Sequence, residues 1–378
     1  METRELSASA PGCPRLFETV QAVLTERGND LLLAPLDADA AHVLSRAIER
    51  LGWEHSRRGS ALLLLNARPR IANLRDALLQ HIPTSVQVRI KGVLMNGAAW
   101  TAETLLGAFL RSETLPVLFE QTEVAWVSEV FQRGLLFSVY HPIVDAADGQ
   151  VFAYEALIRA THPETGETVG AGQLIHAAGR MNLQRHFDQR ARETAIRCAA
   201  AFADTDLRLF VNFAPGAIYE PELCLQSTVQ AARETGIDMR RLVFEVIETE
   251  QIPSMDRLRK LADYYRSQGA GIALDDISSG FSSLQYLTDL LPDYVKVDRD
   301  LVASAEANSS ARHTLESIVG LARKLNVRVI AEGIETRQQL AICLDAGVDY
   351  LQGYLFGMPA FPPQSIPPGL FDCQLRAA

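Results

Sequence analysis

The residues of this chain best suited to chemistry are acidic side chains in or at the end of short apolar segments. Glu155 stands in residues 154–159, Glu245 stands in residues 243–246, and the pair Asp275-Asp276 directly follows an apolar run. A buried carboxylate is costly unless a cation or hydrogen-bond donors compensate it. Oxygen ligands suit Mg²⁺ or Mn²⁺ better than zinc. The pattern therefore predicts a divalent-metal site.

Adjacent aspartates are what a two-metal site would use, because one carboxylate can bridge the ions while its neighbour completes the second ion's shell. Two ions about 3.5–4 Å apart can activate water and stabilise the leaving oxygen of a phosphodiester. Lys296 and Arg159 could contact the phosphate, although an ion pair with a nearby acid is an equally good interpretation. Other polar residues at apolar segments are Asn212, Glu248, Asp298, Glu332, Glu335 and Gln352.

The elements that must position these residues alternate between strand and helix from residue 135 onward. Residues 137–144 and 151–157 predict a hairpin around a turn at residues 148–149. Repeating strand–helix units predict a parallel barrel or a doubly wound sheet, and the lack of GxGxxG disfavours dinucleotide binding. In a barrel, chemistry gathers at the carboxyl ends of the strands. The other expected strands are 207–213, 242–247, 270–274, 294–297, 327–331 and 348–351, and the expected helices are 185–202, 253–268, 313–325 and 337–346.

The N-terminal third predicts a smaller α/β domain without a metal cluster, phosphate loop or nucleophile. Its pattern favours a regulatory or interaction role, and its sequence indicates no ligand. The arginine pairs at 57–58 and 68–70 fit a solvated surface best. Expected strands are 31–33, 61–65 and 86–94, and expected helices are 37–51, capped by Asp37 or Asp39, and 101–110. We divide the chain into a flexible tail (1–15), this domain (16–120), a connecting helix (121–136), the barrel (137–364) and a C-terminal tail (365–378).

Composition and charge narrow the class of protein. Of 378 residues, 48% are hydrophobic and 22% charged, as in ordinary globular proteins. Net charge is −1 over residues 1–125 and −9 over the rest, which disfavours non-specific nucleic-acid binding. The longest apolar run, residues 198–203, is too short to span a membrane. Five scattered cysteines without CxxC spacing, and no apolar leader, favour a cytoplasmic location.

The ordered motifs of residues 137 to about 360 closely resemble the EAL domain family, the cyclic di-GMP-specific phosphodiesterases. Each motif is weak alone, whereas the ordered combination is specific. The segments that carry the resemblance are Tyr140-His141-Pro142-Ile143-Val144-Asp145, Tyr154-Glu155-Ala156-Leu157-Ile158-Arg159, Phe210-Val211-Asn212, Phe244-Glu245-Val246-Ile247-Glu248-Thr249, Leu274-Asp275-Asp276, Ser282-Ser283-Leu284-Gln285-Tyr286-Leu287, Val295-Lys296-Val297-Asp298-Arg299, Ile330-Ala331-Glu332-Gly333-Ile334-Glu335-Thr336 and Leu351-Gln352-Gly353-Tyr354-Leu355-Phe356 with Pro359.

The resemblance implies a modified (β/α)8 barrel whose first strand is antiparallel. It also implies hydrolysis of cyclic di-GMP to linear pGpG with two Mg²⁺ or Mn²⁺ ions, and a homodimer through the barrel. By the family pattern, the first metal's ligands are Glu155, Asn212, Glu245 and Asp275; those for the second metal and the water are Asp275, Asp276 and Glu332; the other catalytic residues are Lys296, Gln352 and Glu335; the substrate contacts are Arg159, Leu157, Asp298 and Pro359; and Glu248 braces the loop after the aspartates.

Two departures from the family pattern keep a second function open. Ile277 replaces an aromatic residue, and Ser278 replaces a glycine in the loop after the aspartates, where a positive φ would now be strained. A weakly active or inactive barrel that serves as a cyclic di-GMP receptor or interaction module is therefore the alternative. His141 replaces a common glutamine, and a structural or surface role suits it at least as well as a catalytic one.

Overall fold

A computed structural model describes residues 29–95, 102–203, 205–217, 225–246, 255–277, 281–363, 366–367 and 370–371. The chain folds into two compact units. The first comprises residues 1–133 with 176–182, and the second comprises residues 134–175 with 183–378. The predicted tail 1–15 lies outside the described residues, as does most of 365–378.

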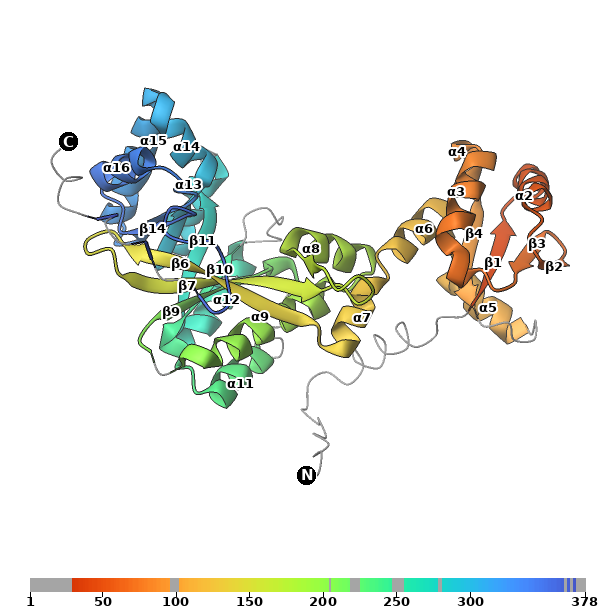
Figure 1. Ribbon diagram of the computed structural model, residues 1–378, viewed down its shortest axis with the longest axis horizontal. Coiled ribbons are helices and arrows are strands. Elements are labelled where there is room, and N and C mark those ends of the chain that lie inside the picture. Colours follow the sequence, from red (N-terminus) through yellow and green to blue (C-terminus); the bar gives the residue numbers. More distant parts are fainter. Residues whose placement is uncertain are drawn as a thin grey trace. The chain divides into compact units, whose positions relative to one another are not determined.

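The first unit is a five-stranded antiparallel sheet with helices, in the strand order β2-β3-β1-β4-β5 (Figure 1). The β1-α2-β2-β3-α3-β4 connection is a split βαβ arrangement. Asp37 caps helix α2, its side chain accepting a hydrogen bond from the Ala40 amide at 2.8 Å. The elements are β1 (Asp30–Pro35), α2 (Ala38–Leu51), β2 (His55–Arg58), β3 (Ala61–Leu64), α3 (Ile71–His81), α4 (Thr84–Gln87), β4 (Ile90–Met95), α5 (Ala102–Arg111) and β5 (Glu113–Thr114).

Two expectations for this part of the chain are wrong in detail. The strand expected over 86–94 starts only at Ile90, because residues 84–87 form the short helix α4. The single connecting helix expected over 121–136 is two helices, α6 (Leu115–Glu123) and α7 (Trp126–Arg133), and residue 136 already belongs to a strand. Alternating β-branched residues in 84–90 match a strand period, but local chain geometry and packing decide the outcome.

The second unit is a closed barrel of eight strands. The short strand β8 pairs with the end of β7, outside the barrel. The order β6-β14-β13-β12-β11-β10-β9-β7 closes through the pairing of β6 with β7. Strand β6 is antiparallel to both neighbours, whereas the other barrel pairings are parallel. The fold predicted from the family resemblance is thereby confirmed. The strands are β6 (Leu136–Asp145), β7 (Val151–Thr161), β8 (Thr168–Val169), β9 (Arg208–Phe213), β10 (Leu242–Val246), β11 (Gly271–Ile277), β12 (Tyr294–Val297), β13 (Arg328–Ala331) and β14 (Tyr350–Gln352).

Helices surround the barrel strands, and the main apolar core fills the space between them (Figure 1). Capping fixes several helix starts: Asp298 accepts from the Asp300 amide, and Thr336 forms a capping box with Gln339. None of the helices within the described residues is long and apolar enough to cross a membrane. The helices are α8 (Ala171–Arg180), of which residues 176–180 belong to the first unit, α9 (Gln184–Cys198), α11 (Gln226–Thr235), α12 (Met255–Ser267), α13 (Phe281–Leu290), α14 (Arg299–Ala307), α15 (Ser309–Lys324) and α16 (Arg337–Ala346).

Candidate active site

The polar residues of the candidate site form one layer inside the barrel, directly above an apolar layer. Side chains two positions apart on a strand point to the same face. On each of the eight strands, one residue packs in or against a small apolar cluster, and a polar residue follows two positions nearer the site. The apolar residues are Ile143, Ala153, Phe210, Val243, Ala273, Tyr294, Ile330 and Tyr350, and the polar residues are His141, Glu155, Asn212, Glu245, Asp275, Lys296, Glu332 and Gln352.

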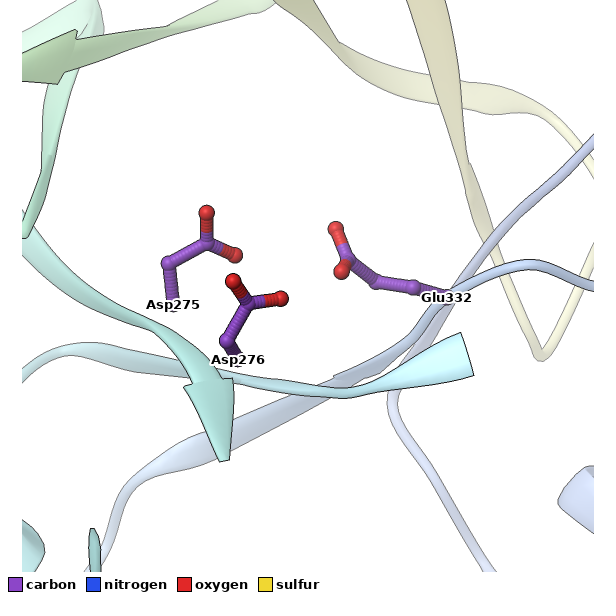
Figure 2. A group of neighbouring side chains, drawn as sticks. All are labelled: Asp275, Asp276 and Glu332. Carbon is purple, nitrogen blue, oxygen red and sulfur yellow. The ribbon is translucent and has the colours of Figure 1, made fainter. Parts of the chain in front are cut away.

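A bulge in β11 turns the two adjacent aspartates toward the same side. Leu274 pairs with Val295 and Ile277 pairs with Val297. Strand β11 therefore contains one more residue than β12 between these two pairs, which is a β-bulge. Asp276 adopts a left-handed backbone with φ +58°, which a short polar residue tolerates best among non-glycine residues. Figure 2 shows the consequence: both aspartate side chains face Glu332. Ligand oxygens of these three residues all lie within 4.8 Å of one another.

Lys296 provides the central positive charge of this layer. Its side chain is 1% exposed, and its Nζ lies 2.6 Å from Glu332, 3.1 Å from Glu245, 3.1 Å from Asp275 and 3.4 Å from Glu155. The four carboxylates reach it from four different strands or strand ends. A lysine at this depth holds its proton only because these acids surround it.

Burial is the main cause of the shifted pKa values of these acids, and a single ammonium faces the five carboxylates. Burial, reinforced by neighbouring acids, raises the pKa of Glu332 to about 8 and that of Asp276 to about 6. It also raises the pKa of Asp275 and, strongly, that of Glu245. For Glu155, burial acts in the same direction, but Lys296 and two amide donors outweigh it and lower the pKa to about 2. The cluster therefore holds protons that a divalent cation could replace.

Glu155 is held by amide groups on both of its oxygens. The Asn212 amide donates to Oε1 at 3.0 Å, and the Gln352 amide donates to Oε2 at 2.8 Å. The same Gln352 nitrogen lies 3.0 Å from Nδ1 of His141. These contacts fix the direction of the Glu155 carboxylate toward Lys296 before any ligand enters.

The residues present fit a divalent cation. Both carboxylate oxygens of Glu245 and Oδ1 of Asp275 are buried without a normal hydrogen bond among the described residues. Lys296 Nζ lies 3.1 Å from one oxygen of each acid and forms an ion pair with both. Buried acceptors rarely stay unpaired. A set of carboxylate and amide oxygens with free lone pairs matches the preference of Mg²⁺ or Mn²⁺.

The remaining predicted residues lie around this layer. Leu157 and Arg159 follow Glu155 on the same face of β7, and the Arg159 guanidinium donates to the Ile158 carbonyl at 2.8 Å. The Asp298 carboxylate caps α14 and is close enough to raise the pKa of Asp276. Glu335 is exposed in the segment before α16, with its amide donating to Gln339, and Pro359 follows β14. Glu248 and Ser278 lie outside the described residues, whereas Ile277 is buried in the main core.

His141 is the member of this layer that sequence reasoning did not assign to the site. Its strand, β6, runs against the others, so the site residue comes two positions before the apolar Ile143 instead of two positions after it. The sequence therefore contains the two-residue spacing between His141 and Ile143, but in the order opposite to that of the other strands. This spacing indicates a site residue only when β6 is known to be antiparallel.

Comparisons with known proteins agree with this geometry. The EAL domain model matches residues 124–359. The cyclic di-GMP phosphodiesterase NbdA of Pseudomonas aeruginosa is 31% identical over 223 residues, which cover 58% of this chain and 28% of that relative. This chain thus matches less than a third of that relative's length, whereas 60% of the Escherichia coli cyclic di-GMP phosphodiesterase PdeL is covered at 29% identity.

A solved structure supports the same assignment. The standalone EAL protein of Vibrio cholerae, in its c-di-GMP-bound form, is 32% identical with a TM-score of 0.56, covering 62% of this chain and 97% of that one. The matched model spans more than half of the 378 residues, and the barrel has the antiparallel first strand and the layered acids described above. The chain belongs to the EAL domain family.

Proposed function

We propose that the barrel hydrolyses cyclic di-GMP to linear pGpG with two Mg²⁺ or Mn²⁺ ions. The observation that carries the proposal is the layer of acids around Lys296, a single cation that faces the buried carboxylates of Glu155, Glu245, Asp275 and Glu332. In the reaction, water adds to one phosphorus as its bond to O3′ breaks, leaving a 5′-phosphate and a 3′-hydroxyl. The choice of cyclic di-GMP as the substrate is supported by the relatives that are named cyclic di-GMP phosphodiesterases.

The carboxylate and amide side chains of the site divide into two groups that would hold the two ions. Glu155, Asn212, Glu245 and Asp275 would hold the first ion, and Asp275, Asp276 and Glu332 the second. The three residues of the second group already place ligand oxygens within 4.8 Å of one another. When bound, the ions would supply positive charge that activates water and stabilises the leaving oxygen. A calcium complex of the Bacillus subtilis EAL-domain protein YkuI with c-di-GMP, 27% identical to this chain with a TM-score of 0.54, supports a cation at such a site.

The other residues bind and orient the phosphodiester. Arg159 would fork onto phosphate oxygens, with Leu157 beside it on the same face of β7. Lys296 would offer a point charge to the phosphate or the attacking water, and Gln352 would align that water. Asp298, Glu335 and Pro359 would complete or support the rim, and Glu248 would brace the loop after the aspartates.

A hydrolysis assay on the full-length chain tests the proposal. The purified protein is incubated with cyclic di-GMP and either Mg²⁺ or Mn²⁺, and pGpG is quantified. We expect metal-dependent pGpG formation that Glu155→Gln abolishes and that Glu316→Gln, an exposed acid of α15, leaves intact. Absence of pGpG with both metals, while an active EAL enzyme turns over in parallel, would refute it.

A receptor without catalysis is the second candidate, favoured by Ile277 and Ser278 in the sequence after the aspartates. It predicts saturable binding of cyclic di-GMP with no pGpG, measured by calorimetry in the same buffers. Homodimerisation through the barrel stays a prediction, which light scattering of the purified chain would test.

A further inference from the structure

The side-chain amide of Gln352 is almost fully buried, and only its nitrogen is paired. Gln352 is 1% exposed, and its Nε2 donates to Oε2 of Glu155 at 2.8 Å and lies 3.0 Å from Nδ1 of His141. Its Oε1 is buried with no hydrogen-bond partner among the described residues. A buried free acceptor beside an acid cluster requires a donor, such as a water molecule, when the site is loaded.

The orientation of this amide is set by its two acceptors. If the amide were turned over, Oε1 would face the carboxylate oxygen of Glu155 at 2.8 Å, and two acceptors would repel each other. Glu155 alone leaves the amide free to turn about a single hydrogen bond. A second acceptor on the other hydrogen fixes the amide plane. His141 is placed to be this second acceptor. Its strand, β6, pairs with β7, which carries Glu155, and with β14, which carries Gln352.

Only one form of His141 can accept this hydrogen bond. Nδ1 must lack a proton, so the proton of the neutral ring belongs on Nε2. Nε2 is buried and makes no hydrogen bond of normal geometry among the described residues. Because the Gln352 nitrogen is already oriented by Glu155, its contact with His141 assigns Nδ1 as the acceptor.

We propose that His141 is a positioning residue: its unprotonated Nδ1 holds the Gln352 amide so that Oε1 faces the reacting water. This inference deepens the proposed phosphodiesterase function and rests on it. Asparagine carries its amide oxygen on Cγ, as histidine carries Nδ1, and can replace the imidazole as the acceptor. Phenylalanine keeps the ring that lies 5.9 Å from the Tyr354 ring but removes both nitrogens.

Nitrogen magnetic resonance tests the hydrogen bond without reference to catalysis. The full-length protein is labelled with ¹⁵N-histidine, and the long-range ¹H–¹⁵N spectrum near neutral pH is recorded with and without Mg²⁺. The His141 signals are assigned by their loss in His141→Phe. We expect an unprotonated Nδ1 and a protonated Nε2 in both spectra. A protonated Nδ1 in either spectrum would overturn the inference.

Kinetics test the consequence. His141→Phe should lower kcat for cyclic di-GMP about 10- to 100-fold, as loss of an outer-shell partner does, with KM little changed. His141→Asn, which keeps an acceptor at the position of Nδ1, should recover most of kcat. His313→Phe, which replaces an exposed histidine of α15, should match the wild type. Wild-type kcat in His141→Phe, or no recovery in His141→Asn, would overturn the inference. An inactive wild type would instead overturn the proposed function, and the spectra would still report on the ring.

Discussion

Replacing Lys296 with methionine should destabilise the protein in the absence of metal and much less in its presence. Methionine keeps the length of the side chain and removes the charge. The substitution leaves four carboxylates, previously within 2.6–3.4 Å of Nζ, without their cation. Because added divalent ions would bind the same acids, they should replace the lost charge.

The magnitude follows from the burial of these groups. One contact at 3.1 Å is worth about 5 kcal/mol at an effective dielectric constant of about 20. The four contacts do not add, because the acids take up protons instead. Protonating one acid whose ordinary pKa is 4.5 costs about 3.4 kcal/mol at pH 7. We therefore expect a loss of about 3–5 kcal/mol, the usual cost of breaking a buried ion pair.

Thermal unfolding measures this loss. For a domain of this size, about 3–5 kcal/mol corresponds to a Tm lower by roughly 6–20 °C in EDTA. In Mg²⁺ or Mn²⁺ the difference from wild type should shrink to a few degrees. Lys260→Met, which removes an exposed lysine of α12, should change Tm little under either condition. Equal losses with and without metal, or no loss in EDTA, would refute the electrostatic reasoning.

Four further predictions concern the same barrel. Because the pKa values of Glu332 (about 8) and Asp276 (about 6) lie above their ordinary values, metal-free stability should fall as pH rises from about 4 to 8. Metal affinity should rise up to about 10-fold per pH unit between pH 6 and 8, measured by calorimetry; a flat profile would contradict proton displacement. Asp275→Asn should lower kcat/KM at least about 100-fold in the pGpG assay, because Asp275 is proposed to bind both ions. A smaller loss would contradict that role. Arg192→Met should lower the unfolding free energy by about 3–5 kcal/mol in chemical denaturation, because buried Arg192 pairs with buried Asp188; a loss below about 1 kcal/mol would contradict this.

The sequence predicted the barrel strands well because buried parallel strands are nearly continuous apolar runs. The strand 294–297 and the helix 337–346 have the predicted bounds. Helix α14 was missed, although Asp298 caps it, because that aspartate was interpreted only as a site residue. The break at residues 124–125 depends on packing that no local pattern records.

The candidate site shows the same division between local and long-range information. The acids were found individually, because a charge inside an apolar run is a local signal. Their meeting required the pairing of eight strands, and the common direction of Asp275 and Asp276 required a bulge defined by the neighbouring strand β12. His141 required the reversed direction of β6.

The left-handed backbone of Asp276 lowers the stability of the fold, although the same residue supplies a carboxylate to the candidate site. Glycine adopts φ +58° without the steric penalty that any side chain meets, which is about 1 kcal/mol or more. Asp276→Gly would therefore relieve local strain while it removes an acid from the second group of ligands. Position 276 thus exchanges backbone strain for an acid beside Asp275 and Glu332, so the residue that would best suit the turn is not the one that suits a cation site.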